Sequence, residues 1–210
     1  MLKVKFKLTS LFSLKKYDDS NLKCQSYEYP TVYAVRSAIL GSIIQIDGID
    51  KAKELFHKIK NANIYVSMPT KYKINGVMQK RYSNSYYSKF DVLDRSIIVS
   101  DEKTRTMGFR QYVHMDTITI YIDNLIPNVE LYLKNIDSIG TSESLVYLDS
   151  IEEVTEMNNI LVEWDNETYC ETYEQYDWDS KSNFNNVYMY SKEKRKQRGY
   201  MCCVKNIMIN

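Results

Sequence analysis

The sequence predicts an α+β protein whose elements follow the order strand, helix, strand, insertion, strand, helix, strand. Residues 2–9 alternate apolar and polar side chains, as a half-buried strand does. Residues 32–46 instead repeat apolar side chains every three or four positions, as the buried face of a helix does. Strand, helix and strand patterns recur between residues 117 and 148. With 210 residues, 44% hydrophobic, six glycines and three prolines, the chain is expected to form one main packed domain, which excludes collagen-like or disordered classes.

Residues 2–61 account for the first strand and two helical segments. The strand places four apolar residues on one side and three lysines with a threonine on the other. Pro30 and Thr31 then open a helix that Asp47-Gly48 ends. A shorter helix is expected from Asp50, an N-cap candidate, with one apolar face through Ile59.

The second half of the pattern begins with a strand at residues 64–68, stopped by Pro69. Residues 117–122 are rich in β-branched side chains and predict another strand. A helix is expected from Pro127 to about Ser138-Ile-Gly140, and residues 145–148 form the fourth strand. This β-α-β-β-α-β order is that of the ferredoxin-like fold, which RNA-recognition modules (RRM-like domains) also use. A fold alone does not give a function.

The remaining residues divide into an acidic part and a basic part. Residues 152–179 contain ten acidic and no basic residues, which predicts either an acidic strand-and-loop extension or a docking surface. Strand-like patterns at 187–190 and 200–209, joined by basic residues 192–198, predict a basic-tipped hairpin. We therefore divide the chain into a domain at 1–151, with an insertion at 71–108, and a mainly β C-terminal extension at 152–210.

The insertion carries the strongest chemical signal. Residues 71–110 hold nine basic and four acidic residues, a local net charge of +5, interleaved with six tyrosine and phenylalanine rings. Cations for phosphates and flat rings for bases are what single-stranded nucleic acid requires. Asn75-Gly76 predicts a hairpin turn within the segment. The alternative is a long exposed hairpin that is charged only to stay soluble and unpaired at its edges.

Other functions find little support in the sequence. The net charge of +1 argues neither for nor against a nucleic-acid partner. Four cysteines without a CxxC pair and only two histidines make no zinc site, so we expect reduced thiols, no metal and no cofactor. Motifs of nucleotide-binding, zinc-protease and esterase sites are missing, and the dispersed carboxylates of 152–179 do not suit a two-metal nuclease. No apolar run suits a membrane span or signal peptide, so we expect a cytoplasmic protein without a membrane partner.

Several segments, taken in order, resemble one protein family. They are the strand Leu2-Lys-Val-Lys-Phe-Lys-Leu8, the helix Tyr29-Pro-Thr-Val-Tyr-Ala-Val-Arg-Ser-Ala-Ile-Leu-Gly41, the basic insertion, the returning strand Phe109-Arg-Gln-Tyr-Val113 and the turn Ile136-Asp-Ser-Ile-Gly-Thr-Ser-Glu-Ser-Leu145. This pattern is similar to the CRISPR-associated (Cas) protein family five, a subunit of type I Cascade complexes. The resemblance covers about residues 1–155. The extension matches no pattern, and Gly199 is its only glycine where family members often carry more.

The resemblance implies a non-catalytic RNA-binding subunit. Such a subunit caps the 5′ handle of CRISPR RNA, contacts the backbone subunit through its insertion, called the thumb, and helps to anchor the large subunit, so that target DNA is contacted only indirectly. Because the chain lacks a convincing catalytic set, type I-B is favoured. Arg36, one turn into a helix with a positive N-terminal end, is a candidate phosphate contact or an ordinary surface arginine. The candidate RNA-binding residues are Arg36, Lys71, Lys73, Lys80, Arg81, Tyr82, Arg105, Arg110 and Tyr112.

Two alternatives remain open. One branch of the family, in type I-C systems, cleaves precursor CRISPR RNA without metal through Tyr, Lys and His side chains. Here His114, with Tyr112 and Arg110 on the same side of a regular strand, is the candidate acid-base group, although a lone strand histidine is more often structural. His57 is interpreted as a solvated helix residue. The other alternative is a protein adaptor without RNA contact, in which the 19 tyrosines and the acidic segment meet a basic partner.

Overall fold

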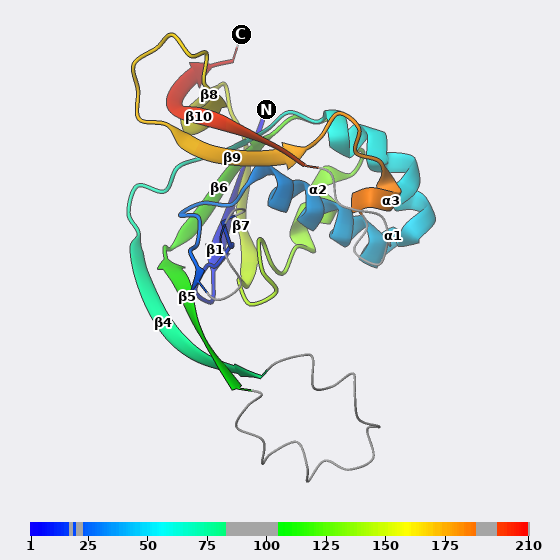
Figure 1. Cartoon of the computed structure of the whole chain (residues 1–210). Coiled ribbons are helices and arrows are strands. Elements are labelled where there is room, and N and C mark those ends of the chain that lie inside the picture. The colour runs from blue at the N-terminus through cyan, green and yellow to red at the C-terminus, as the bar shows by residue number, and fades with distance from the viewer. Residues whose placement is uncertain (17–18, 20–22, 83–104, 188–196, 210) are drawn as a thin grey trace, which may run out of the picture.

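The computed structural model describes residues 1–16, 19, 23–82, 105–187 and 197–209 and confirms the predicted α+β class (Figure 1). The elements are β1 Leu2–Leu8, β2 Lys23–Cys24, α1 Val32–Asn61, β3 Ile64–Val66, β4 Lys73–Tyr82, β5 Arg105–His114, β6 Thr117–Ile122, α2 Val129–Lys134, β7 Val146–Glu153, β8 Glu156–Glu163, β9 Tyr173–Trp178, α3 Phe184–Val187 and β10 Gln197–Met208. Strands and helices of the first part lie where the sequence patterns predict them.

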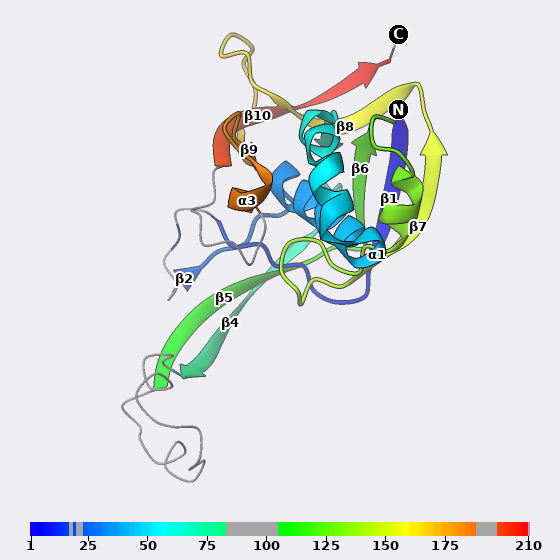
Figure 2. The same cartoon turned by 90° about the vertical axis from the view of Figure 1, so that its right-hand side faces the viewer.

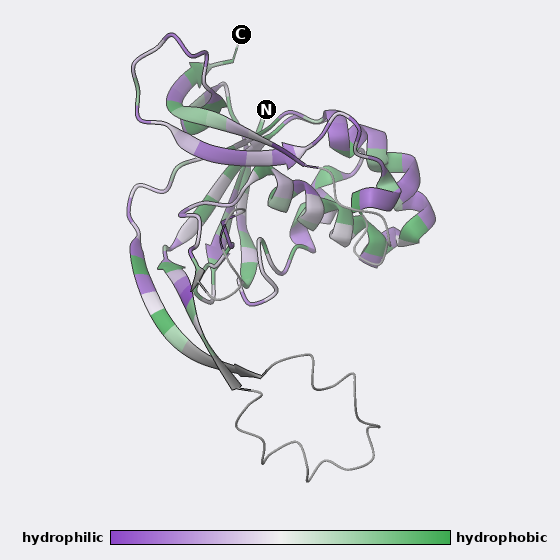
Figure 3. Ribbon diagram, in the orientation of Figure 1, coloured by the Kyte–Doolittle hydropathy of each residue, from purple (hydrophilic) through white to green (hydrophobic). Residues whose placement is uncertain are grey.

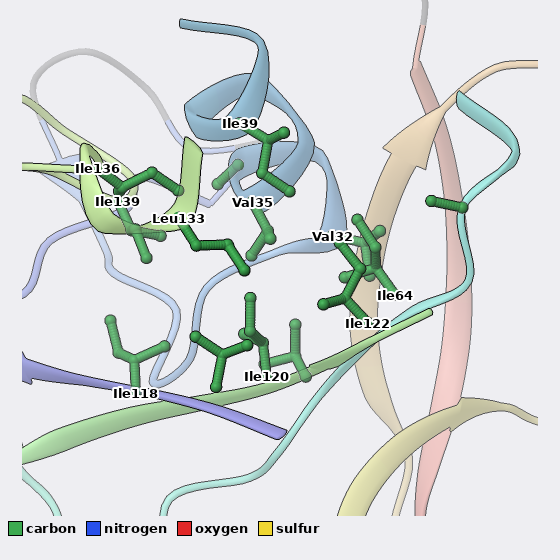
Figure 4. Close-up of a cluster of buried hydrophobic side chains, with 14 of the residues drawn as sticks. Val32, Val35, Ile39, Ile64, Ile118, Ile120, Ile122, Leu133, Ile136 and Ile139 are labelled. Atoms are coloured by element: carbon green, nitrogen blue, oxygen red, sulfur yellow. The ribbon is translucent and has the colours of Figure 1, made fainter. Parts of the chain in front are cut away.

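A four-stranded antiparallel sheet with the order β3-β6-β1-β7 forms the centre of the molecule. Helices α1 and α2 lie on the same face of this sheet (Figures 1 and 2). Val4 and Phe6 of β1 and Ile120 of β6 point to that face and are fully buried. Val35 and Ile39 of α1 complete the core from the other side (Figure 4). Burial of such a side chain stabilises the fold by roughly 1.5–3 kcal/mol, so this layer is the main source of stability.

Helix α1 bends sharply at Gly48, which has a positive φ and an extended ψ (φ 86°, ψ 175°), a conformation that is essentially restricted to glycine. At the start of the helix, the Thr31 hydroxyl accepts a hydrogen bond from the Ala34 amide (3.2 Å). A straight helix would separate Arg36 from Ala62 by about 39 Å, yet an Arg36 nitrogen lies 2.9 Å from the Ala62 carbonyl oxygen. The two halves of α1 therefore fold back on each other, and the two predicted helical segments meet at Gly48.

By length and composition alone, α1 is apolar enough to cross a membrane. The bend divides it into residues 32–47 and 49–61, each shorter than the ~20 residues that a span requires. The apolar side chains Val35, Ile39 and Ile43 are fully buried in the protein core. These features are those of a core helix.

The C-terminal extension forms a second antiparallel sheet with the order β8-β10-β9. Trp178 and Cys202 of this sheet are buried in the main core, and Trp178 stacks on Phe56 of α1 with ring centroids 4.9 Å apart. Where β8 crosses the outer face of the central sheet, Met157 and Ile160 pack against Tyr121 in a small second core. The extension thus shares its packing with the first part of the chain.

The predicted strand at residues 187–190 is wrong in the part that the structure describes. Val187 ends the short helix α3, because Asn183 and Asn186 each accept a hydrogen bond from the other's amide (2.9 and 3.0 Å) and close a helical turn. Residues 188–196, which hold most of the predicted basic tip, lie outside the described residues. β10 pairs instead with β8 and β9.

One buried ion pair connects the extension to both halves of α1. The Arg36 guanidinium donates from Nε to Asp177 Oδ1 (2.7 Å) and from Nη2 to Asp177 Oδ2 (3.0 Å). Its Nη1 donates to the carbonyl oxygens of Ile59 and Ala62, near the end of α1. The Arg36 side chain is only 7% exposed, so these partners offset the cost of removing its charge from water.

Asp177→Asn should lower the free energy of unfolding by about 3 kcal/mol, because it leaves the buried Arg36 charge without its counter-ion. Urea unfolding measures this change. The matched control is Asp50→Asn, which breaks an exposed ion pair with Lys53 and should leave the free energy of unfolding unchanged. Equal stabilities of the two variants would contradict the role given to Arg36.

Candidate nucleic-acid interface

The predicted insertion forms a long antiparallel hairpin of β4 and β5 that extends away from the central sheet (Figures 1 and 2). Its base is fixed to the body of the protein, because the fully buried Val113 exchanges two backbone hydrogen bonds with Phe12 (2.8 and 2.9 Å). The short strand β2 pairs with the other edge of β5. The predicted β-structure is confirmed for the part of the insertion that the structure describes, residues 73–82 and 105–108.

The predicted turn at Asn75-Gly76 is wrong. Both residues lie inside β4, where Asn75 pairs with Tyr112 and Gly76 pairs with Gln111. Glycine occurs here for a different reason, since a Cβ atom on Gly76 would lie 2.5 Å from the ring of Phe109. A glycine inside a strand often marks such a close approach. The connection between β4 and β5 falls at residues 83–104, outside the described residues.

Polar and charged residues share one face of this hairpin. Directly paired residues of antiparallel strands project to the same side, so the pairs Lys73/His114, Asn75/Tyr112 and Val77/Arg110 lie on one face. We call these six residues the hairpin face. His114 and Lys73 are exposed, and Figure 3 shows hydrophobic and hydrophilic residues mixed along β4. The arrangement places an ammonium, an imidazole and an aromatic ring within two neighbouring rungs.

Arg110 is held in place by contacts within the protein. Its Nη1 lies 2.9 Å from Glu143 Oε2, and its Nε donates to the Ser13 hydroxyl (3.3 Å). The guanidinium carbon lies 5.2 Å from the centre of the Tyr112 ring, a cation–π distance. Arg110 therefore orients Tyr112 while a carboxylate neutralises its charge.

Two open cavities meet at the base of the hairpin. The first, of about 520 Å³, is lined by residues 70–73 and 114–116, and we call it the hairpin-base cavity. The second, of about 450 Å³, is lined by residues 7–11, Tyr147 and the same residues 114–116, and we call it the sheet-end cavity. Because His114, Met115 and Asp116 line both, the two cavities are neighbours along one surface.

The structure gathers some of the predicted RNA-binding residues and separates others. Lys71 and Lys73 line the hairpin-base cavity, and Arg110 and Tyr112 lie on the hairpin face. Arg36 lies elsewhere, in the buried ion pair with Asp177. The residues Lys80, Arg81, Tyr82 and Arg105 lie in β4 and β5, and their side chains fall outside the described part of the structure.

His114 is exposed, whereas Ile118, Ile120 and Ile122 are buried, although all four residues have even numbers and would share one side of a regular strand. The reason is the break at Met115-Asp116, which separates β5 from β6 and reverses the alternation. Arg110, Tyr112 and His114 consequently share a face, as a regular strand predicts. His57 lies on an exposed part of α1, with its Nε2 2.8 Å from the Asn61 amide nitrogen.

The described residues were compared with the chemistry of metal and thiol sites. Within residues 1–16, 19, 23–82, 105–187 and 197–209, no three His, Cys, Asp or Glu side chains are placed to hold a metal ion. The four cysteines are free thiols. Burial raises the pKa of the Cys202 thiol to about 12, which keeps it protonated and unreactive at neutral pH.

The sheet-end cavity adds two residues to the site that were not among those predicted from the sequence. Lys7 and Tyr147 line it and pair directly across β1 and β7. The signal was present in the alternation of residues 2–9, which put Lys7 on the polar side of its strand. The position of Tyr147 beside Lys7 depends on the pairing of β1 with β7, which joins residues 140 positions apart. Local sequence patterns do not encode such a pairing.

Comparison with known proteins finds similarity to a curated protein and to a solved structure. No family model matches the chain. A curated protein described as the CRISPR-associated protein Cas5 of Archaeoglobus fulgidus is 23% identical over 159 residues, which cover 74% of this chain and 65% of that relative. The match thus spans less than two thirds of the relative's length. A solved structure, described as a CRISPR protein from Archaeoglobus fulgidus, aligns with 100% of this chain and 91% of its own, with 13% identity and a TM-score of 0.49.

Gly76→Ala should destabilise the hairpin by about 1 kcal/mol, because its methyl group would overlap the Phe109 ring. Faster amide hydrogen exchange in β4 and β5 is the expected observation. Gly41→Ala is the matched control: it adds a methyl group that meets no atom within 4 Å and should stabilise α1 by roughly 0.5–1 kcal/mol. Unchanged exchange in the Gly76 variant would contradict the observed pairing of β4 with β5.

Proposed function

Since the chain belongs to the Cas5 family of CRISPR-associated proteins, we propose that it is an RNA-binding structural subunit of a type I Cascade complex, of subtype I-B. In this role it caps the 5′ handle of CRISPR RNA and contacts the backbone and large subunits in antiviral defence. It works in the cytoplasm, and target DNA is contacted only indirectly. These functions follow from the family and from the chemistry of the hairpin base.

The observation that carries the proposal is the register of the hairpin. It sets Lys73 opposite His114 and Asn75 opposite Tyr112, beside the hairpin-base cavity that Lys71 and Tyr72 also line. Lysine ammonium groups bind phosphates, and tyrosine rings stack on unpaired bases. An amide such as that of Asn75 has both donors and acceptors for a base edge. This combination suits a single RNA strand better than an apolar protein surface.

We also propose how the fold divides into a domain, a thumb and an extension. The order β1-α1-β3-β6-α2-β7, with strands arranged β3-β6-β1-β7, supports a ferredoxin-like domain at residues 1–151. The thumb, predicted at residues 71–108, corresponds to the β4–β5 hairpin, whose second strand continues to His114. Residues 152–210 form the C-terminal extension, whose acidic part at 152–179 is a candidate surface for a neighbouring subunit.

Arg36 is left out of the proposed RNA surface. Its guanidinium has two carboxylate and two carbonyl partners within the protein and is nearly buried. A phosphate would have to displace Asp177 to reach it.

Lys71→Ala combined with Lys73→Ala should weaken binding of labelled CRISPR-repeat RNA about tenfold and should lower the salt dependence of binding by ~0.7 in log–log slope per lost phosphate contact. Fluorescence anisotropy at several salt concentrations measures both quantities. The matched control, Lys51→Ala with Lys53→Ala on the helical side, should bind as the wild type does. We expect a similar loss for Arg81→Ala combined with Arg105→Ala. Unchanged affinity in both hairpin variants would remove the thumb from the RNA site.

Glu143→Gln should strengthen RNA binding by about two- to fivefold, because it frees the Arg110 guanidinium from its carboxylate partner. The same anisotropy titration measures the change. Arg110→Ala with Glu143→Gln is the control and should lose this gain. A weaker affinity in the single variant would show that Arg110 only positions Tyr112.

A second function is favoured by the exposure of His114 on one face with Tyr112 and Arg110. A metal-independent endoribonuclease needs such a group to move the proton of the 2′-hydroxyl. A gel of CRISPR-repeat RNA with the protein in EDTA, with His114→Ala alongside, separates the two. Cleavage lost in the variant establishes the nuclease, and binding without cleavage supports the structural subunit. If the protein neither binds nor cleaves the RNA, the protein adaptor is favoured.

A further inference from the structure

The face of the central sheet opposite the helices carries a row of lysines. Side chains alternate along β1, so Val4 and Phe6 point to the helices while Lys3, Lys5 and Lys7 point away. The end near Lys3 lies beside Tyr121, which packs under β8. The half around Lys5 and Lys7 is open, and their side chains are 35% and 47% exposed.

The strand register arranges this open half in two rungs. Tyr147, Lys7 and Thr117 lie side by side in one rung, because Lys7 pairs with both of its neighbours directly. Ser150, Lys5 and Thr119 form the next rung. Direct partners project to the same face, so an aromatic ring, two ammonium groups and several hydroxyls gather there. Tyr147 is 48% exposed.

This surface continues from the candidate site. Lys7 and Tyr147 line the sheet-end cavity, which shares His114, Met115 and Asp116 with the hairpin-base cavity. An RNA strand bound at the hairpin base can therefore reach the rung of Tyr147, Lys7 and Thr117 along one continuous surface.

We propose that single-stranded RNA bound at the hairpin base continues through the sheet-end cavity onto the open face of the sheet. Tyr147 stacks on one base there, and Lys5 and Lys7 bind phosphates. This inference rests on the proposed function and extends it to a second surface. Stacking on a tyrosine tolerates any base, and threonine and serine hydroxyls add donors for the RNA backbone.

The acidic residues on β7 set the path of the bound RNA and do not prevent RNA binding. Lys7 Nζ lies 2.8 Å from Asp149 Oδ1, and Lys5 Nζ lies 4.0 Å from Glu152 Oε1. The bond to Asp149 raises the pKa of the Lys7 ammonium, which stays charged. An ammonium has three donors, and exposed ion pairs are weak. Repulsion from the two carboxylates places the phosphates over β1 and β6, with a base toward Tyr147.

The test is binding of a labelled single-stranded RNA of about ten nucleotides, long enough to pass from the hairpin base to the sheet. Tyr147→Ala should raise Kd about tenfold, and Tyr147→Phe should bind as the wild type does, because stacking requires only the ring. Lys5→Ala should raise Kd severalfold and reduce the salt dependence. Tyr169→Ala and Lys58→Ala are the matched controls, since both residues are exposed elsewhere and should leave Kd unchanged.

The outcomes separate this inference from the proposed function. Wild-type affinity in both Tyr147→Ala and Lys5→Ala, with weaker binding in the Lys71/Lys73 variant, overturns the inference alone and assigns the sheet face to a protein neighbour. Loss of binding in Tyr147→Phe overturns the stacking role. A wild-type chain that does not bind the probe overturns both.

Discussion

The rest of the structure depends on the ion pair between Arg36 and Asp177. It joins residues 141 positions apart and, through the Ile59 and Ala62 carbonyls, also holds the two halves of α1 together. The folded-back helix then presents Val35 and Ile39 to the sheet, and the sheet in turn fixes β6 and the hairpin that precedes it. A buried guanidinium is tolerated only because each of its nitrogens has a partner. The extension is therefore part of the structural support of the site, although it lies far from the site in sequence.

Local periodicity explains why the central elements could be predicted and why other features could not. The strands at 2–9 and 117–122 and the helix at 32–46 each show their burial in their own sequence. Asn75-Gly76 has the composition of a turn, but its glycine makes room for Phe109, 33 positions away. Val187 looks like a strand residue, whereas two asparagine side chains make its segment helical. The partner of Arg36 and the rung of Tyr147 depend on long-range contacts, which no local pattern shows.

The near-zero net charge of the chain conceals a separation of charge at the hairpin base. Lys71 and Lys73 line the cavity, while burial and the nearby carboxylates Glu28 and Glu171 raise the pKa of Tyr72 between them. Carboxylates and lysines thus flank the same tyrosine. On the proposed function, the carboxylates repel the RNA backbone and restrict its path to the lysine side. Specific placement of an RNA strand in this way requires no excess of positive charge over the whole protein.

The two-residue connection between β5 and β6 has a mechanical consequence. Met115-Asp116 joins the hairpin to a central strand of the sheet, and Met115 is buried while Val113 is tied to Phe12. On this side the hairpin is therefore joined to the sheet by a short connection that is anchored by the buried Met115 and by the Phe12–Val113 bridge. A displacement of β5 would reach β6 through these two residues and, through β6, the helices that pack on the sheet. A neighbouring subunit that docks on the hairpin would thus influence the position of the helices on the other face of the sheet.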